Sequence, residues 1–507
     1  AHHPAAPHAR PRCIDPHHDP RNMPQRTALA PRNPGVDPWD DLPENQQRLA
    51  CRLQEAFAAF LDHTDAQIGR LVDGLRSLGQ IDNTLLVVLA DNGASQEGGP
   101  FGVMHEMKFF NGILETPDET IDRLDEIGGP HSHTNYPWGW AQAGNSPFKW
   151  YKQNTHEGGV HVPMVVHWPD GVAADQRGER RDQFVFAADV APTVYDILGI
   201  APPDTYHGVE QLPVTGHSFV SAIGDPDAPA TNTVQYFEMG GSRALVAGEW
   251  KAVCKHDQGA DYDTETWELY HLASDFSECV DLAAEQPDKL EELIGLWWEE
   301  AERHGALPLD DRMIELFGAR FRPNSPHPGN RRYVYRPPMS PMPAQASAAI
   351  AGRDFDLTAR ITRSPGDDGV LFATGTENSG ISVFVQDDHL VVDYNAFDDH
   401  AILQSTVPVP SGPSQLVARF RRGEGMAGSV SLEVDGTLGG EVELPLYMRM
   451  ISSVGSSVGY DHGSAVSERY DAPFPFGGEL HEVEIQLSPD RFADADEVSA
   501  RAEMGRQ

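Results

Sequence analysis

The sequence has few cysteines, few basic residues and no long apolar run, and each shortage argues against a class of protein. Its 4 cysteines are widely spaced and form no Cys-x-x-Cys pair, so they define neither a zinc site nor a disulfide framework. No apolar stretch reaches membrane-spanning length, which predicts a soluble chain without a membrane partner. No charged segment followed by an apolar core marks a secretion signal, and the compartment stays open.

Basic residues are outnumbered two to one. The chain has 38 Lys and Arg against 77 Asp and Glu, for a formal net charge of -39. Such a field argues against nucleic acid and anionic membranes as partners. An anionic small molecule could bind only where the chain supplies a local positive site.

The N-terminal part of the sequence alternates between helix and strand patterns after an irregular start. Residues 1–36 are rich in Pro, His and Arg and show no periodicity, which predicts an irregular segment. Apolar residues recur at three- and four-residue steps over 45–78, so we expect a helix that stops at Gly79. Apolar strands are predicted at 84–90 and 162–168, and a helix at 189–199. This alternation favours an α/β layer fold.

The C-terminal part has a different period. Residues 317–345 are rich in proline and predict a linker with little regular structure. Beyond them polar and apolar residues alternate in short runs with turn signals between, which predicts an all-β sandwich over 346–490. The polar tail 491–507 predicts a short helix or irregular chain. The predicted strands are 355–361, 381–385, 416–420, 430–434 and 479–487.

The most informative motif is Thr84-Leu-Leu-Val-Val-Leu-Ala-Asp-Asn-Gly93, an apolar run that ends in two oxygen-bearing side chains. A continuous apolar run suits a buried strand of a parallel sheet, and such sheets bind ligands beyond the carboxyl ends of their strands. Asp91 and Asn92 offer the oxygen ligands that Ca²⁺ or Mg²⁺ prefers. By itself, Asp-Asn-Gly is also an ordinary turn.

A second motif contains two lysines shortly before a Gly-Gly turn and the next strand. Lys149 and Lys152 precede Gly158-Gly159 within Ser146-Pro-Phe-Lys-Trp-Tyr-Lys-Gln-Asn-Thr-His-Glu-Gly-Gly-Val-His-Val-Pro163. An ammonium group at the same sheet edge as Asp91 would bind a phosphate or sulfate oxygen. The simpler alternative is two solvated lysines on a loop.

Taken in order, these motifs resemble the central part of sulfatases in the alkaline phosphatase-like superfamily. The likeness covers roughly residues 37–490 and is strongest to the large bacterial arylsulfatases, whose C-terminal extension resembles the predicted sandwich. The segments that carry it are 65–73, 82–93, 151–159, 189–193, 248–252 and 267–270.

The resemblance implies a fold, a reaction and site residues. The fold is an alkaline phosphatase-like α/β domain over 37–316 with a mixed, mostly parallel sheet, followed by a concanavalin- or laminin-G-like sandwich. The reaction is Ca²⁺-dependent hydrolysis of sulfate monoesters by a formylglycine nucleophile. By position, Asp91 and Asn92 match metal ligands, and Lys152 matches the lysine that bridges the sulfate and its leaving oxygen. His8 resembles the histidine that protonates the leaving alcohol.

One departure from the family pattern affects catalysis. The family makes its nucleophile in a C/S-x-P-x-R motif, which occurs nowhere in these 507 residues. The early strand with paired aspartates that completes the family's metal site is also missing, and two protein ligands hold Ca²⁺ weakly. We therefore expect the α/β domain to be incomplete and this chain alone to be catalytically deficient.

Two alternatives to a sulfatase acting on a small-molecule or glycan sulfate ester stay open. One is a phosphate or phosphonate ester hydrolase of the same superfamily, because similar metal sites serve both reactions. The other is a non-catalytic homologue whose sandwich binds a glycan. The oligomeric state is also left open.

Overall fold

The computed structural model describes residues 28–311, 332–452 and 454–488, which belong to two compact units. Unit 1 contains the described residues of the ranges 1–34, 82–94 and 142–307. Unit 2 contains those of the ranges 35–81, 95–141 and 308–507. The predicted tail 491–507 lies outside the described residues.

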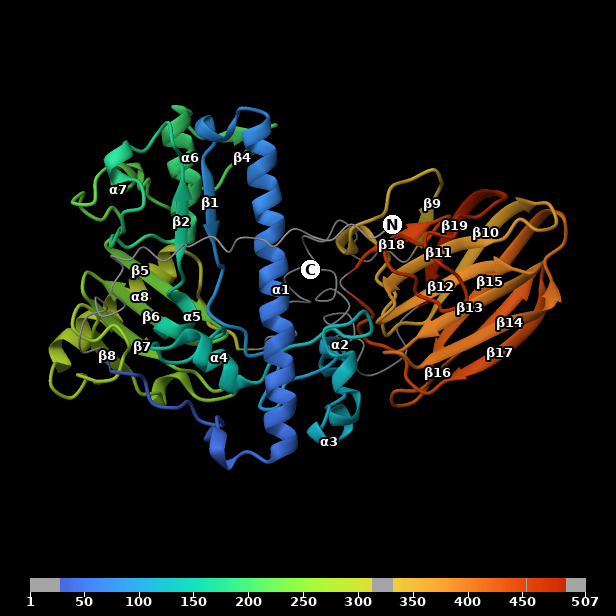
Figure 1. Cartoon of the computed structure of the whole chain (residues 1–507), viewed down its shortest axis with the longest axis horizontal. Coiled ribbons are helices and arrows are strands. Elements are labelled where there is room, and N and C mark those ends of the chain that lie inside the picture. Colours follow the sequence, from blue (N-terminus) through green and yellow to red (C-terminus); the bar gives the residue numbers. More distant parts are fainter. Residues whose placement is uncertain (1–27, 312–331, 453, 489–507) are drawn as a thin grey trace, which may run out of the picture. The chain divides into compact units, whose positions relative to one another are not determined.

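Unit 1 holds the two apolar strands that the sequence predicted, but they pair antiparallel. Strands β1 (Leu86–Leu89) and β2 (Met164–His167) lie side by side, with Leu86 opposite His167 and Leu89 opposite Met164 (Figure 1). The parallel direction predicted for this strand was therefore wrong. An apolar run indicates a strand but not its direction relative to its neighbour. A parallel pair is usually joined by one crossover helix, whereas about 70 residues separate β1 from β2.

These strands are also less buried than predicted. Val88, Leu89 and Val165 are 40%, 41% and 60% exposed. Burial is concentrated on the side of β2 that faces α7 (Val220–Gly224), where Phe219 and Ile223 pack against Met164 and Val166. The prediction of a strand covered on both faces was thus wrong. An apolar sequence shows that the residues favour burial, but it does not show whether other elements pack on both faces of the strand.

A second sheet in unit 1 gave no clear pattern in the sequence. It is antiparallel, with the order β5-β6-β7-β8, and helix α8 (Pro287–Arg303) packs on it through the fully buried Trp297. The indole Nε1 of Trp297 donates to the carbonyl oxygen of Phe237, 3.0 Å away, which fixes the helix to β5. The strands are β5 (Val234–Met239), β6 (Ser242–Ala247), β7 (Trp250–Cys254) and β8 (Glu268–His271).

The other elements of unit 1 are short. The helix predicted at 189–199 is confirmed as α6 (Val190–Leu198), and it ends at Gly199, whose φ of 63° suits glycine. The remaining elements are α5 (Glu157–Val160), β3 (Thr205–Tyr206) and β4 (Val209–Glu210), while α4 (Trp138–Asn145) spans the boundary between the two units along the chain.

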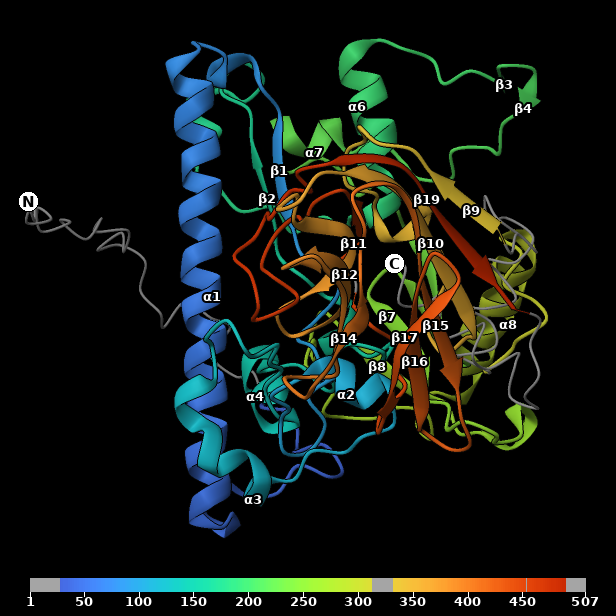
Figure 2. The same cartoon turned by 90° about the vertical axis from the view of Figure 1, so that its right-hand side faces the viewer.

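Unit 2 begins with the long helix predicted at 45–78, which is confirmed as α1 (Glu44–Ser77). Figure 2 shows it as one straight rod. Its first turns bury Leu49 and Leu53, whereas Phe60 and Leu71 are 70% and 60% exposed. Gly79, with a φ of 65°, follows the last turn as predicted. The inserted segment 95–141 adds α2 (Glu106–Phe110) and α3 (Pro117–Thr120).

The predicted β-sandwich is confirmed and forms most of unit 2. A six-stranded antiparallel sheet of order β17-β16-β15-β10-β19-β9 and a five-stranded sheet of order β14-β13-β12-β11-β18 share one apolar core. Along β10 buried and half-buried residues alternate strictly, as expected for a strand with one face in the core. The strands are β10 (Phe355–Arg363), β11 (Gly369–Thr376), β12 (Ser379–Gln386), β13 (His389–Asn395), β14 (His400–Pro408), β15 (Gly412–Arg422), β16 (Gly428–Val434), β17 (Thr437–Leu444), β18 (Ser456–Val458) and β19 (Glu479–Leu487).

The predicted linker contributes one strand to this sandwich. Residues 332–335 form β9 (Arg332–Tyr335), which pairs with β19 and buries Tyr333 and Tyr335 in the core. The prediction of little regular structure was wrong here. The alternation Arg-Tyr-Val-Tyr is only four residues long. The prolines on either side of it dominate the local composition and therefore favoured the prediction of a linker.

Candidate functional site

The carboxyl end of β1 presents the two predicted metal ligands. Asp91 is exposed, and among the described residues no hydrogen bond or ion pair engages its carboxylate. Asn92 is half-buried, and its Nδ2 donates to the carbonyl oxygen of Gly93 at 2.8 Å. This bond orients the amide and leaves Oδ1 available as an acceptor. Two hard oxygen ligands therefore follow the strand directly.

Two backbone hydrogen bonds fasten this strand end to the lysine segment. The Gly93 N–H donates to the carbonyl oxygen of Gly159 at 3.0 Å, and the Lys152 N–H donates to that of Ala94, also at 3.0 Å. Lys152 is thus held one hydrogen bond away from the turn that carries Asp91 and Asn92. The juxtaposition of these two motifs, which the sequence predicted, is present in the structure.

Asn145, at the end of α4, clamps the same two segments from a third direction. Its Oδ1 accepts from the Ala94 N–H at 3.0 Å. Its Nδ2 donates to the carbonyl oxygens of Gly158 at 2.6 Å and Trp150 at 3.2 Å. One side-chain amide therefore satisfies backbone groups on both sides of the contact. The sequence gave no signal for this role, because Asn145 is 51 residues from Ala94 and lies in no recognisable pattern.

The contact between these two segments of the chain requires a glycine on each of them. A Cβ added at Gly93 would lie 1.7 Å from the Gly158 carbonyl oxygen, and one added at Gly158 would lie 2.1 Å from that of Trp150. Distances this short are repulsive for any side chain. The Asp-Asn-Gly and Gly-Gly motifs thus allow two backbones to approach closely.

The two lysines of the motif have different environments. Lys149 Nζ lies 2.9 Å from Glu268 Oε2 and 2.9 Å from the Tyr270 hydroxyl, so it is not a solvated lysine. Glu268 also accepts from His156 Nε2 at 2.9 Å. Burial alone would raise the pKa of Glu268, but the hydrogen bonds from His156 and Tyr270 outweigh it and lower the pKa to about 2. Lys149 is therefore part of a structural cluster.

A cluster of buried charged side chains lies next to the Gly-Gly turn. Lys251 on β7 is fully buried, with Nζ 2.7 Å from Glu157 Oε1 and 3.0 Å from Glu278 Oε1. His161 Nδ1 lies 2.6 Å from the other Glu157 oxygen. Burial would raise the pKa of Glu157, yet the Lys251 ammonium and His161 lower it to about 2. Glu157 and His156 thus form contacts that support the turn.

The predicted site residues are therefore placed as follows. Asp91, Asn92 and the backbone of Lys152 come together, while His8 lies outside the described residues, so its role stays a prediction. Sequence reasoning missed Asn145, Glu268 and Lys251. The segments 248–252 and 267–270, which the family resemblance singled out, contain Lys251 and Glu268, so the motifs marked these positions without revealing their contacts.

The side-chain oxygens after β1 are of the kind that Ca²⁺ binds, but two residues supply fewer oxygens than Ca²⁺ requires. The exposed Asp91 carboxylate and the oriented Asn92 amide are oxygen ligands of the kind Ca²⁺ takes. Ca²⁺ binds about six to eight oxygens, so these residues would hold part of its coordination shell.

Among the described helices, none is both long enough and apolar enough to cross a bilayer.

Comparison with known proteins defines the class to which this arrangement belongs. Residues 2–200 match the family model described as Sulfatase, and residues 147–295 match that described as N-sulphoglucosamine sulphohydrolase, C-terminal. The two matches overlap across the lysine and Gly-Gly segment. Together the two matches span residues 2–295, and this part of the chain is similar to sulfatases.

Individual relatives agree with this assignment. The chain is 30% identical over 294 residues to an uncharacterized sulfatase of Schizosaccharomyces pombe, and this alignment covers 57% of this chain and 50% of that protein. It is 30% identical over 186 residues to an arylsulfatase of Klebsiella aerogenes, covering 36% of this chain and 38% of the relative. An N-acetylgalactosamine-6-O-sulfatase of Bacteroides thetaiotaomicron is 26% identical over 238 residues, covering 45% and 38%. The chain thus spans half or less of the length of these relatives.

Proposed function

We propose that this chain carries the sulfate-binding part of a Ca²⁺-dependent sulfuric ester hydrolase. The observation that supports it is the pairing of the Asp91–Asn92 strand end with the Lys152 turn through the Gly93 to Gly159 and Lys152 to Ala94 hydrogen bonds. A metal-binding strand end and a lysine on adjacent backbones are suited to a doubly charged oxyanion between them.

Each residue has a role in this proposal. Asp91 and Asn92 hold Ca²⁺, which when bound neutralises charge that develops on the sulfuryl oxygens. Lys152 binds a sulfuryl oxygen and the leaving oxygen. His8 donates a proton to the leaving alcohol, as the resemblance implies. No residue of this chain is assigned the nucleophile, because the C/S-x-P-x-R motif occurs nowhere in these 507 residues.

The charge of the chain explains why the proposed site needs a lysine, a role that the family resemblance assigns to Lys152. With a net charge of -39, the protein repels anions over most of its surface, and binding a sulfate requires a local cation. Lys152 is half-buried in the turn beside Asp91 and Asn92, where a cation is needed.

The substrate class we propose is a sulfated sugar. A relative that is 26% identical to this chain is named an N-acetylgalactosamine-6-O-sulfatase, which acts on a sulfate ester of a sugar hydroxyl. A sulfate ester of this kind presents three peripheral oxygens to a metal and a lysine, and its sugar to the surrounding surface.

A turnover assay of the 507-residue chain tests this assignment. With p-nitrophenyl sulfate and Ca²⁺ we expect no hydrolysis above that of heat-denatured chain, because the nucleophile is missing. Turnover of about 1 s⁻¹ or faster would contradict the expected catalytic deficiency of this chain. Hydrolysis of p-nitrophenyl phosphate in a parallel assay would instead indicate a phosphate ester hydrolase.

A further inference from the structure

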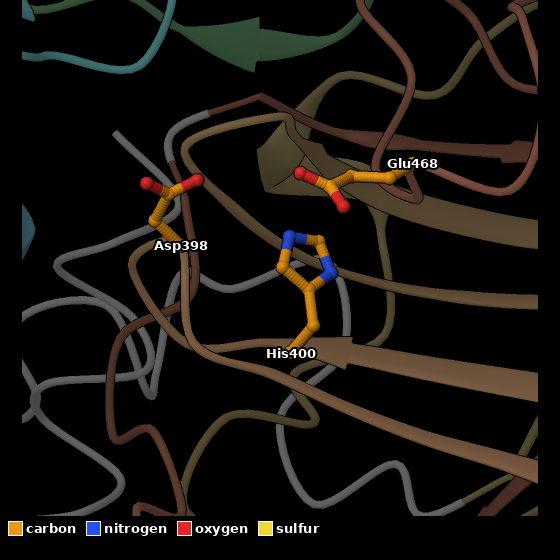
Figure 3. Close-up of side chains that lie close together, drawn as sticks. All are labelled: Asp398, His400 and Glu468. Atoms are coloured by element: carbon orange, nitrogen blue, oxygen red, sulfur yellow. The ribbon is translucent and has the colours of Figure 1, made fainter.

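The β-sandwich brings together three side chains of the types that bind metal ions. Asp398, His400 and Glu468 each offer one ligand atom, and these atoms lie within 4.8 Å of one another. They come from three places: the turn before β14, the first residue of β14, and the loop between β18 and β19. Figure 3 shows the His400 ring pointing toward the carboxylates of Asp398 and Glu468.

The orientation of His400 is fixed by a residue outside this group. Its Nδ1 lies 2.9 and 3.0 Å from the two carboxylate oxygens of Asp393 on β13, which is fully buried. With Nδ1–H donating to Asp393, the other ring nitrogen, Nε2, is the one left to bind a cation. A carboxylate behind a histidine is the usual arrangement at metal sites, because it sets the tautomer and makes the imidazole a stronger ligand.

A further imidazole lies beside the same turn without any hydrogen bond. His105 is 1% exposed, and neither of its ring nitrogens has a hydrogen-bond partner in the described structure. Its ring centroid is 6.3 Å from that of Phe397, the neighbour of Asp398. Burial lowers the pKa of His105 to about 4, so the ring is neutral at pH 7 and able to bind a metal. Buried nitrogens without a partner are rare in proteins.

Arg123 and His131 lie near the Asp398 carboxylate, where they would compete with a metal ion for its oxygens. Arg123 Nη2 lies 3.1 Å from Asp398 Oδ2, and His131 Nδ1 lies 3.5 Å from Oδ1. Arg123 is also paired with Glu126, so its charge is shared between two carboxylates. His131 is about half-exposed and is itself a possible metal ligand when neutral. The surroundings therefore weaken a cation site without removing a ligand from it.

We propose that Asp398, His400 and Glu468 bind a divalent transition metal ion, with Zn²⁺ the best match. An imidazole with two carboxylates suits Zn²⁺, which takes nitrogen and oxygen ligands in a tetrahedron. Ca²⁺ prefers six to eight oxygens and gains little from imidazole. Three protein ligands leave the fourth tetrahedral position for water or for a donor atom of a bound molecule.

Titration calorimetry with ZnCl₂ tests the site, using the 507-residue chain and two variants. Glu468 is exposed, so Glu468→Gln removes a ligand without disturbing the core. Glu479→Gln is the matched control, because Glu479 forms a surface pair with His481 at 3.3 Å but has no third ligand. Because the chain has 22 histidines, the readout is the change in the tightest Zn²⁺ affinity and not the total stoichiometry.

We expect Glu468→Gln to weaken the tightest Zn²⁺ binding at least tenfold and Glu479→Gln to leave it within twofold. Anomalous diffraction at the zinc edge should place the ion between Asp398, His400 and Glu468. Equal affinity in wild type and Glu468→Gln, or an anomalous peak elsewhere only, would overturn the proposal. Displacement of Zn²⁺ by an equal concentration of Ca²⁺ would overturn the assignment to a transition metal.

Discussion

Replacing Lys251 by methionine is expected to lower the free energy of unfolding by about 3–5 kcal/mol. The Lys251 ammonium is the shared partner of Glu157 and Glu278, at 2.7 and 3.0 Å, and both carboxylates are buried. Methionine matches the length of the lysine stem and removes only the charge. Two carboxylates would then remain in a low-dielectric interior, with the His161 ring 2.6 Å from one of the Glu157 oxygens.

The measurement is urea unfolding followed by tryptophan fluorescence, since Trp250, Trp267 and Trp297 lie in the same unit. The control is Lys289→Met on α8, which removes a surface pair with Glu292 at 2.8 Å and should cost no more than about 0.5 kcal/mol. A loss below about 1 kcal/mol for Lys251→Met would show that the buried carboxylates are solvated or protonated, against the arrangement described above.

The second large effect is expected at the glycine contact. Gly93→Ala should lower the free energy of unfolding by about 1–3 kcal/mol, because the new methyl group would lie 1.7 Å from the Gly158 carbonyl oxygen. Relief of that clash moves the Asp91–Asn92 turn away from the Lys152 turn. The hydrogen bond from the Gly93 N–H to Gly159 is then stretched or broken.

The same substitution at Gly295 provides the control with opposite sign. Gly295 is exposed in the interior of α8, and an added Cβ meets no atom within 4 Å. Alanine there should stabilise the protein by about 0.5–1 kcal/mol, because it reduces the entropy of the unfolded chain. Urea midpoints of the two variants compare them directly. Equal shifts for Gly93→Ala and Gly295→Ala would mean that the Gly93 contact is not close in solution.

Local patterns predicted those parts of the fold that local physics determines. Helix α1 and its stop at Gly79 follow from a 3.6-residue period and a left-handed glycine, and β10 follows from strict alternation. The direction of β1 against β2 was beyond such patterns, because it depends on how the chain returns across more than 70 residues. The strand β9 was hidden by the prolines around it.

The candidate site shows the same division. Asp91, Asn92 and Lys152 were named from their residue types together with the family resemblance, and their roles stay predictions. Asn145 could not, because its role rests on bonds to backbone groups 13 and 51 residues away. Lys149 and Lys152 look equivalent in sequence, which gives no sign of the contact between Lys149 and Glu268.

The most direct test of the central claim is the kcat/KM for p-nitrophenyl sulfate of the protein read from its gene together with any upstream coding sequence. We predict that wild type and Lys289→Met turn over equally well with Ca²⁺. Lys152→Met should be at least about 100-fold slower, the effect typical of losing one group that binds the transition-state oxyanion. A Lys152→Met variant within threefold of wild type would contradict the claim that the Lys152 turn and the Asp91–Asn92 strand end bind the sulfate together.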